Sequence, residues 1–163
     1  MDDGWRVLPY LNIGSAGIGM VVQELLAHGA DEALDAAQAG IARAAVGDLV
    51  VQSGLFNGRA GLMVYLARLA PFPADAVVSH LHALAWHAVP YEGNIAFVGD
   101  QLMRLSTDLA TGSAGVLLAM GAVLSERPMG LPFFRPASWN AIASDGQRRP
   151  ASAVHAPRAA GRR

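Results

Sequence analysis

The glycine pair Gly58 and Gly61, in the stretch SGLFNGRAGL (residues 53–62), is the pattern in this sequence with the clearest chemical potential. It stands where a polar turn gives way to an apolar run with helical spacing. Glycines at a helix start let another backbone approach closely and leave the first N–H groups of the helix open to an anion. The same pair also lets neighbouring helices crowd together, and the spacing alone does not separate these two roles.

Composition excludes several other kinds of chemistry. The 163 residues contain no cysteine, which excludes disulfides, a cysteine nucleophile and thiolate-bound zinc. All twelve basic residues are arginine, so a phosphate-binding loop of the type Gly-x-x-x-x-Gly-Lys-Ser/Thr is absent as well. His80 and His82 would lie about 200° apart on a helix, and His87 lies too far along that helix to share a metal ion with His80. We expect these histidines to be structural or solvated.

Three copies of one pattern give the glycine pair a context. The stretches LNIGSAGIG (residues 11–19), LFNGRAGLM (55–63) and LATGSAGVL (109–117) align as Leu-x-x-Gly-x-Ala-Gly-aliphatic. Their first glycines, Gly14, Gly58 and Gly112, are 44 and 54 residues apart, which is close to the length of two helices with their turns. Each copy is therefore predicted to open a hairpin of helices.

Apolar residues at helical spacing predict two helical pairs and one further helix. The first pair ends at Gly29 and Gly47, and the second ends before Pro71 and before Pro90. After the third copy, GVLLAMGAVL (residues 115–124) is apolar on almost every side, as expected for a helix buried on both faces. The predicted fold class is all-α.

A short β-hairpin is predicted between the second and third copies. Residues 95–98 and 102–105 flank Gly99-Asp100, a pair typical of a two-residue turn, and such an insertion explains the longer second spacing. Residues 1–134 hold the predicted domain and carry six Arg against twelve acidic residues. Residues 135–163 carry six Arg against Asp145 alone and lack periodicity, so we expect a basic, disordered tail there.

The overall composition bounds the class of protein. With 53% hydrophobic and 15% charged residues, the chain is too apolar to be disordered throughout. No apolar run reaches the roughly 18 residues of a membrane-spanning helix, and the N-terminus lacks the basic start of a signal peptide. A soluble, cytoplasmic protein is the expectation.

The quoted motifs resemble the C-terminal part of lanthionine synthetase C-like cyclases, and most closely the cyclase domain that ends class III lanthipeptide synthetases. The resemblance rests on PYLNIGSAGIG, SGLFNGRAGL, MRLSTDLATGSAGVLLAMGAVL and the closing LPFF, covers about residues 9 to 134, and is most specific from Asp108 to Leu118. It implies a partial α/α toroid in which the starts of inner helices line a cavity. There a peptide cysteine adds to a dehydrated serine or threonine, forming a thioether ring (lanthionine) or the related labionin.

The resemblance also implies that this chain works without zinc. In zinc-dependent members a Cys lies ahead of one motif and a Cys-His pair ahead of another, and the matching positions here are Asn12, Phe56 and Asn57. Phenylalanine cannot bind zinc, and amide oxygens bind it poorly. No cofactor is therefore expected.

Without a metal, another group must favour the thiolate form of the substrate cysteine, because a free thiol has a pKa of about 8.5. Arg59 is the nearest cation within the motifs, and Asn57 could hold the substrate or a developing enolate. Asp108 could orient Arg59 or Arg104. The candidate catalytic residues are Asn57, Arg59 and Asp108, and the candidate substrate-binding residues are Asn12, Arg104 and Thr111. Each catalytic candidate has a structural alternative, as a helix or turn cap or as a rim residue.

A closed toroid needs more helical pairs than this chain supplies, so the sequence predicts a cyclase-domain fragment that is inactive by itself. Kinase motifs are absent from it. The expected partners are the precursor peptide and the remaining kinase, lyase and cyclase portions of a synthetase, with no nucleic acid and no membrane. Two alternatives stay open: a non-catalytic helical module that binds a leader peptide or partner protein, and an α/α toroid acting on carbohydrate, which lacks the carboxylate pair that such an enzyme needs.

Overall fold

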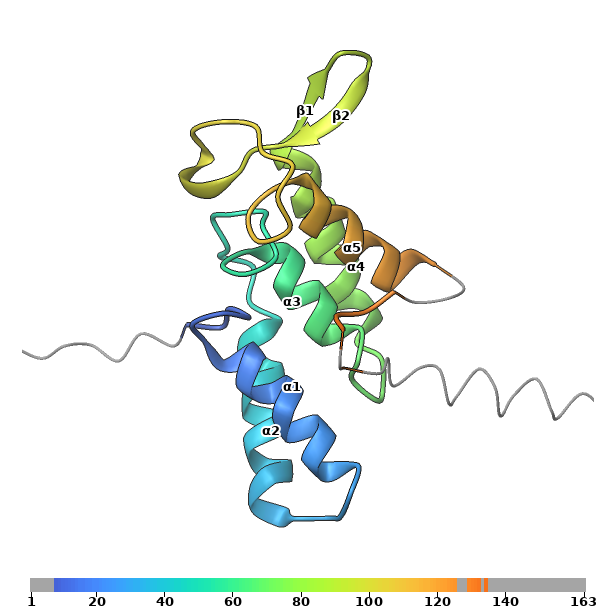
Figure 1. Cartoon of the computed structure of the whole chain (residues 1–163). Coiled ribbons are helices and arrows are strands. Elements are labelled where there is room, and N and C mark those ends of the chain that lie inside the picture. Colours follow the sequence, from blue (N-terminus) through green and yellow to red (C-terminus); the bar gives the residue numbers. More distant parts are fainter. Residues whose placement is uncertain (1–7, 126–128, 133, 135–163) are drawn as a thin grey trace, which may run out of the picture.

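The computed structural model describes residues 8–125, 129–132 and 134 of the chain. In this part of the chain the structure is mostly helical with one small antiparallel sheet (Figure 1), which confirms the helical class and the presence of a hairpin. The helices are α1 (Ser15–Leu26), α2 (Glu32–Ala45), α3 (Arg59–Leu66), α4 (Ala74–Leu84) and α5 (Ser113–Leu124). The strands are β1 (Ala88–Tyr91) and β2 (Asn94–Phe97), and short 3₁₀ turns cover Ala85–His87 and Asp100–Leu102.

The helix starts follow local rules of two kinds. α2 begins after Asp31, whose carboxylate accepts a hydrogen bond from the Leu34 N–H at 2.9 Å, and Glu32 adds negative charge to the first turn. In contrast, α1, α3 and α5 each begin after the first glycine of a repeat copy, in an extended conformation and without a side-chain cap. Their first N–H groups therefore need partners from the backbone, which the preceding loops supply.

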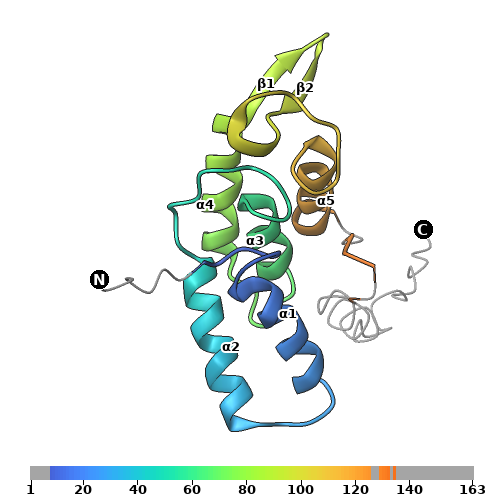
Figure 2. The same ribbon diagram turned by 60° about the vertical axis from the view of Figure 1, so that its left-hand side comes forward.

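Helices α1, α3 and α5 lie in a row, and α2 and α4 pack behind them (Figures 1 and 2). α3 is the centre of the core because it contacts α1, α2, α4 and α5. All eight of its residues are buried, including Arg59 at its start. The pairs α1–α2 and α3–α4 and the additional helix α5 are thus neighbouring units, and α3 is the helix that contacts all the others.

Close backbone packing explains the second glycine of each repeat copy. A methyl group added at Gly61 would overlap the Leu55 carbonyl oxygen and lie 3.0 Å from the Leu11 Cβ of the preceding copy. At Gly115, the equivalent position, it would overlap the Leu109 carbonyl oxygen and lie 2.8 Å from the Leu55 Cβ. The glycines therefore let each helix of the row press against the loop of its neighbour.

The hairpin lies one strand earlier in the chain than the sequence predicts. β2 pairs with β1, and the register joins Val89 to Ala96 and Tyr91 to Asn94. Glu92 and Gly93 form the turn with φ angles of 46° and 76°, the left-handed conformation that tight hairpin turns require. The predicted turn at Gly99-Asp100 is wrong, because a 3₁₀ turn follows there and residues 102–105 form no strand beyond a single bridge between Val98 and Leu105.

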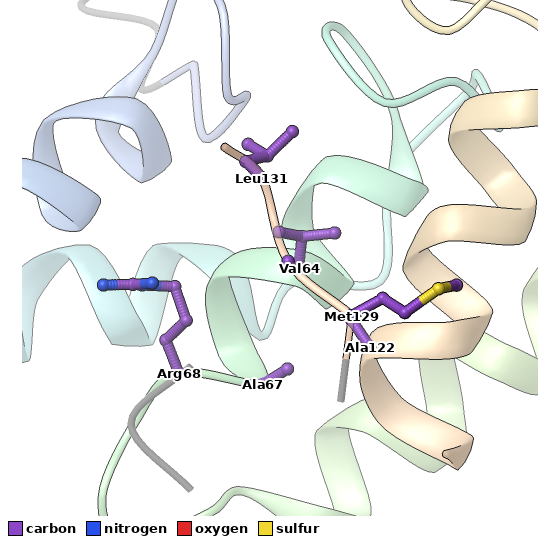
Figure 3. A pocket seen from close by; sticks show the side chains of 7 residues that line it. Val64, Ala67, Arg68, Ala122, Met129 and Leu131 are labelled. Atoms are coloured by element: carbon purple, nitrogen blue, oxygen red, sulfur yellow. The ribbon is translucent and has the colours of Figure 1, made fainter. Parts of the chain in front are cut away.

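The segment after α5 returns across α3 (Figure 3). Met129 and Leu131 lie beside Val64 and Ala122, and the space left between these side chains is about 10 Å³, too small for a ligand. Arg68 at the end of α3 donates a hydrogen bond from Nε to Gln23 Oε1 at 3.1 Å, pairs with Glu24, and lies 5.2 Å from the centre of the Phe134 ring. The segment is thereby held against α1 and α3.

In the described ranges, no helix is both long and apolar enough to cross a membrane. The predicted disordered tail, residues 135–163, lies outside the described residues, as does Phe133 of the LPFF stretch.

Candidate functional site

The loops that open the three repeat copies lie side by side and are joined through their backbones. The Asn12 N–H donates to the Phe56 carbonyl at 2.9 Å, and the Phe56 N–H donates to the Ala110 carbonyl at 2.9 Å. Asn12, Phe56 and Ala110 occupy the same position in their copies, directly after the leucine. Equivalent residues from segments far apart in the sequence therefore form one continuous row.

Each loop also closes on the helix that it starts. The N–H groups of Ser15, Arg59 and Ser113 donate to the carbonyls of Leu8, Gln52 and Ser106 at 2.8, 2.9 and 2.8 Å. In all three copies the acceptor lies seven residues before the donor. Because these amides already have partners, they do not offer the anion cradle that the glycine pair alone would allow. Close packing is the role of the glycines that the structure supports.

The positions that match zinc ligands lie in the first two loops of this row. Asn12 is exposed, Phe56 is 38% exposed, and Asn57 is partly buried. The Asn57 Oδ1 atom is fully buried, and no hydrogen-bond partner for it exists among the described residues. No cluster of three or more His, Asp or Glu side chains that could hold a metal ion occurs in the described part of the chain.

Arg59, predicted as the local cation, is only 4% exposed, and its side-chain partners lie in α4 and in the α2–α3 link. Its Nη1 donates to His80 Nδ1 at 2.9 Å, and its Nη2 donates to the carbonyls of Asp48 and Val50 at 3.1 and 3.2 Å. The guanidinium thus ties the start of α3 to α4 and to the α2–α3 link. Burial lowers the pKa of Arg59, and the charge of Asp48 opposes this effect.

His80 is the buried partner of Arg59, and no local pattern in the sequence indicated this pair. Its Nε2 lies 2.9 Å from the Ala45 carbonyl, an acceptor, so Nε2 carries the proton and Nδ1 accepts from Arg59. Burial is the main cause that lowers the pKa of His80 below 6.5; Arg59 lowers it further, and the hydrogen bond to Ala45 and the charge of Asp48 raise it. The residue is therefore neutral near pH 7 and has a structural role, as expected.

Asp108 caps the third loop. One carboxylate oxygen accepts from the Thr111 N–H at 2.7 Å, and the other accepts from the Thr111 hydroxyl at 2.9 Å and from the Ser106 hydroxyl. These hydrogen bonds, with that from Ser106 the largest contribution, lower the pKa of Asp108 to about 2. It is a carboxylate at neutral pH. No hydrogen bond or ion pair joins it to Arg59 or Arg104 in the described structure, so neither of the predicted orienting contacts is present.

Three of the predicted residues share an open pocket beside the third loop. Arg104, Asp108 and Thr111 line a space of about 340 Å³. A second pocket of about 680 Å³ adjoins it and is lined by Arg104, Ser106 and the face of the hairpin that carries Tyr91 and Ala96. Neither pocket is lined by Asn12, Asn57 or Arg59, so the six candidates do not form a single site.

The pockets contain residues that sequence reasoning missed. Tyr91 and Ser113 line the larger pocket, and the Ser113 hydroxyl accepts a hydrogen bond from the Phe97 N–H at 3.0 Å, which fixes the end of β2 against the start of α5. Ser113 stands directly after Gly112, so the repeat itself marked the position. Tyr91 could not be predicted at this pocket, because the predicted hairpin begins only at residue 95 and so does not include it.

No protein-family model matches the chain. A protein of Streptomyces coelicolor described as "Probable SapB synthase" is 49% identical to it over 140 residues. The match covers 83% of this chain and 15% of the relative, so the chain spans a small part of the length of the curated relative that it matches.

Proposed function

We propose, from the relationship to a lanthipeptide synthetase that this similarity supports, that the chain forms part of the region that closes rings in a precursor peptide. The observation that carries the proposal is 49% identity, over 140 residues and 83% of this chain, with the protein described as "Probable SapB synthase". The row of equivalent loops adds support, because ring closure needs a surface that holds two distant parts of one peptide together.

A toroidal arrangement of the class III type belongs to this proposal. Helices α1 and α5 are the two ends of the row of helices, and each exposes apolar side chains: Ile18 is 62% exposed on α1, and Leu117 is 58% exposed on α5. α3 between them buries every residue. Further helical pairs of the same kind would cover α1 and α5, as these two helices cover α3. In this proposal residues 1–134 are part of the cyclase domain and residues 135–163 a tail.

The proposed reaction is the addition of a cysteine thiol to a dehydrated residue. The cysteine thiol first loses its proton to solvent, and its sulfur then forms a bond to the β-carbon of the alkene. The electron pair of the alkene moves onto the neighbouring carbonyl as an enolate, and a proton from solvent then adds to the α-carbon. Arg104 supplies positive potential that favours the thiolate and the enolate. Asp108 stays ionised and holds Thr111 in place, and Asn57 offers an amide in the neighbouring loop. Arg59 contributes by fixing the second loop through His80.

A replacement at the third loop tests this function in the intact synthase. We expect Asp108→Asn and Thr111→Val to leave dehydration of the precursor peptide unchanged and to slow ring closure about tenfold to a hundredfold, because both release the Arg104 pocket from its fixed geometry. Mass spectrometry counts water loss, and alkylation counts residual thiols. Asp35→Asn, on the exposed side of α2, is the matched control.

Equal loss of dehydration and ring closure in both variants would contradict a specific role in closure. Thermal melting of the same samples separates this outcome from a loss of folded protein.

Zinc independence is a second testable part of the proposal. Since Asn12, Phe56 and Asn57 stand at the ligand positions, we expect purified chain to carry far less than one zinc ion per molecule and a chelator to leave its melting temperature unchanged. Elemental analysis before and after treatment with EDTA measures both. One tightly bound zinc per chain would overturn this part of the proposal.

Binding of a peptide without chemistry is the second candidate function. It is favoured by the lining of the smaller pocket, in which the carboxylate of Asp108 has a pKa of about 2 and so is a poor base at neutral pH. The count of residual thiols in the experiment above distinguishes this candidate, because a binding module would leave the rate of ring closure unaffected by Asp108→Asn.

A further inference from the structure

The two pockets beside the third loop form one groove. They share the lining residues Arg104 and Ser106. The walls come from three segments: the hairpin, the loop of residues 99–108 and the start of α5. Buried Phe97 and its hydrogen bond to Ser113 hold the hairpin wall in place. The groove is therefore a fixed feature of the fold.

The two ends of the groove differ in charge. Among the described residues, Arg104 is the only charged one that lines the larger pocket, and the other lining residues are apolar or carry hydroxyls. The smaller pocket is lined by Arg104 together with two carboxylates, Asp100 and Asp108. An acidic ligand group is therefore attracted to the larger pocket and repelled from the smaller one.

The guanidinium of Arg104 is available to bind a ligand. Its side chain is exposed and makes no hydrogen bond or ion pair within the described structure. The carboxylate of Asp108, which also lines the smaller pocket, already accepts hydrogen bonds from Ser106 and Thr111. An incoming carboxylate can thus form a paired contact with the guanidinium without breaking an existing one.

Apolar side chains border the same groove. Tyr91 is 53% exposed and lines the larger pocket with Leu105, and Met103 is 80% exposed at the smaller one. Gln101 and Leu102 hold φ angles of 55° and 58°, a conformation that costs non-glycine residues energy, and this turn carries Met103 outward. Exposed aromatic and methionine side chains around a polar centre are typical of peptide-binding surfaces.

We infer that this groove binds an extended segment of a precursor peptide, with an acidic side chain paired to Arg104 in the larger pocket and a neighbouring apolar side chain against Tyr91 and Leu105. The inference rests on the proposed function, which supplies a peptide as the substrate. Hydroxyls of Ser106, Thr107 and Ser113 line the larger pocket and can bond to the backbone of such a segment. The carboxylates of the smaller pocket set the direction in which the peptide lies.

The test uses the full chain and two fluorescein-labelled twelve-residue peptides, one of alternating Leu, Ser and Glu and one with Lys in place of every Glu. Fluorescence anisotropy measures their binding at low salt. We expect the Glu peptide to bind more tightly than the Lys peptide, and Arg104→Glu to weaken its binding at least tenfold and to reverse the preference. Arg43→Glu, an equal change of charge on the exposed surface of α2, is expected to leave the preference as it is.

Equal weakening by Arg104→Glu and Arg43→Glu would overturn the inference, because net charge would then explain the binding. So would equal binding of both peptides to the unchanged protein. Arg104 is exposed, so its replacement is expected to leave the melting temperature unchanged. This experiment involves no ring closure, so its failure is distinguishable from a failure of the proposed function, which the counts of water loss and residual thiols measure.

Discussion

Replacing Gly58 by alanine is expected to destabilise the chain strongly. The new Cβ would lie 2.6 Å from the Gln52 carbonyl oxygen and 2.7 Å from both the N and the O of Gly54. All three contacts are with backbone atoms, so no side chain can rotate away. The loop cannot shift outward either, because Phe56 is bonded to the loops on both sides. We expect a loss of about 3 kcal/mol or more, a large fraction of the stability of a small domain.

Urea unfolding followed by circular dichroism measures this loss. Gly40→Ala is the matched control, since a methyl group there would meet only the end of the Arg43 side chain, at 3.8 Å, within α2. Alanine is the better helix former, so the control is expected to gain about 0.5 to 1 kcal/mol. If Gly58→Ala unfolded at the same urea concentration as the unchanged chain, the tight closure of the second loop would be disproved.

Arg59→Leu is the second replacement with a large expected effect. It removes the donors that satisfy His80 Nδ1 and the carbonyls of Asp48 and Val50. Each buried polar group left without a partner costs about 1 to 3 kcal/mol, so we expect a loss of about 3 to 5 kcal/mol. Arg43→Leu, on the exposed surface, is expected to change the free energy of unfolding by less than about 0.5 kcal/mol.

The pH dependence of unfolding gives a second readout for Arg59→Leu. The pKa of His80 is lowered in the folded state, chiefly by burial and also by Arg59. The folded state therefore binds fewer protons than the unfolded state below pH 6.5. The stabilising contribution is complete above that pH and is lost as the pH falls, at up to about 1.4 kcal/mol per pH unit. Without Arg59 the pKa of His80 rises, so the variant should lose less stability between pH 7 and pH 5.5.

An identical acid sensitivity in the unchanged chain and in Arg59→Leu would mean that the guanidinium does not act on His80. His82→Gln supplies the comparison for histidine content, because His82 lies on the same helix and is exposed.

The helices could be predicted from the sequence because their information is local. Apolar spacing acts over a few residues, and the five predicted helices are all present, although α4 ends at Leu84 and not just before Pro90, which lies in β1. The hairpin was misplaced although its turn is local as well. Glu92 carries a side chain yet takes a left-handed conformation, and Gly99-Asp100 has the more usual turn composition.

The site was harder to predict because side-chain directions depend on distant segments. Arg59 and His80 are 21 residues apart, and only the packing of α4 against α3 brings them together. The position of Arg59 inside a glycine motif therefore predicted a cation available for catalysis, whereas its guanidinium is hydrogen-bonded to His80 and to two carbonyls. Arg104, predicted to bind substrate, is exposed and follows the turn in which Gln101 and Leu102 have positive φ angles. The catalytic roles of Asn57, Arg59 and Asp108 stay predictions.

The row of backbone hydrogen bonds between the loops has a consequence for how such chains can change length in evolution. Each loop is closed over a constant seven residues and is joined to its neighbour at a constant position, so an insertion or deletion inside a copy would break several bonds at once. The stretches between copies carry no such constraint. The hairpin accounts for the longer second interval and leaves the row intact. Segments of new specificity can therefore be gained or exchanged between copies, and the hairpin wall of the groove stands at such a place.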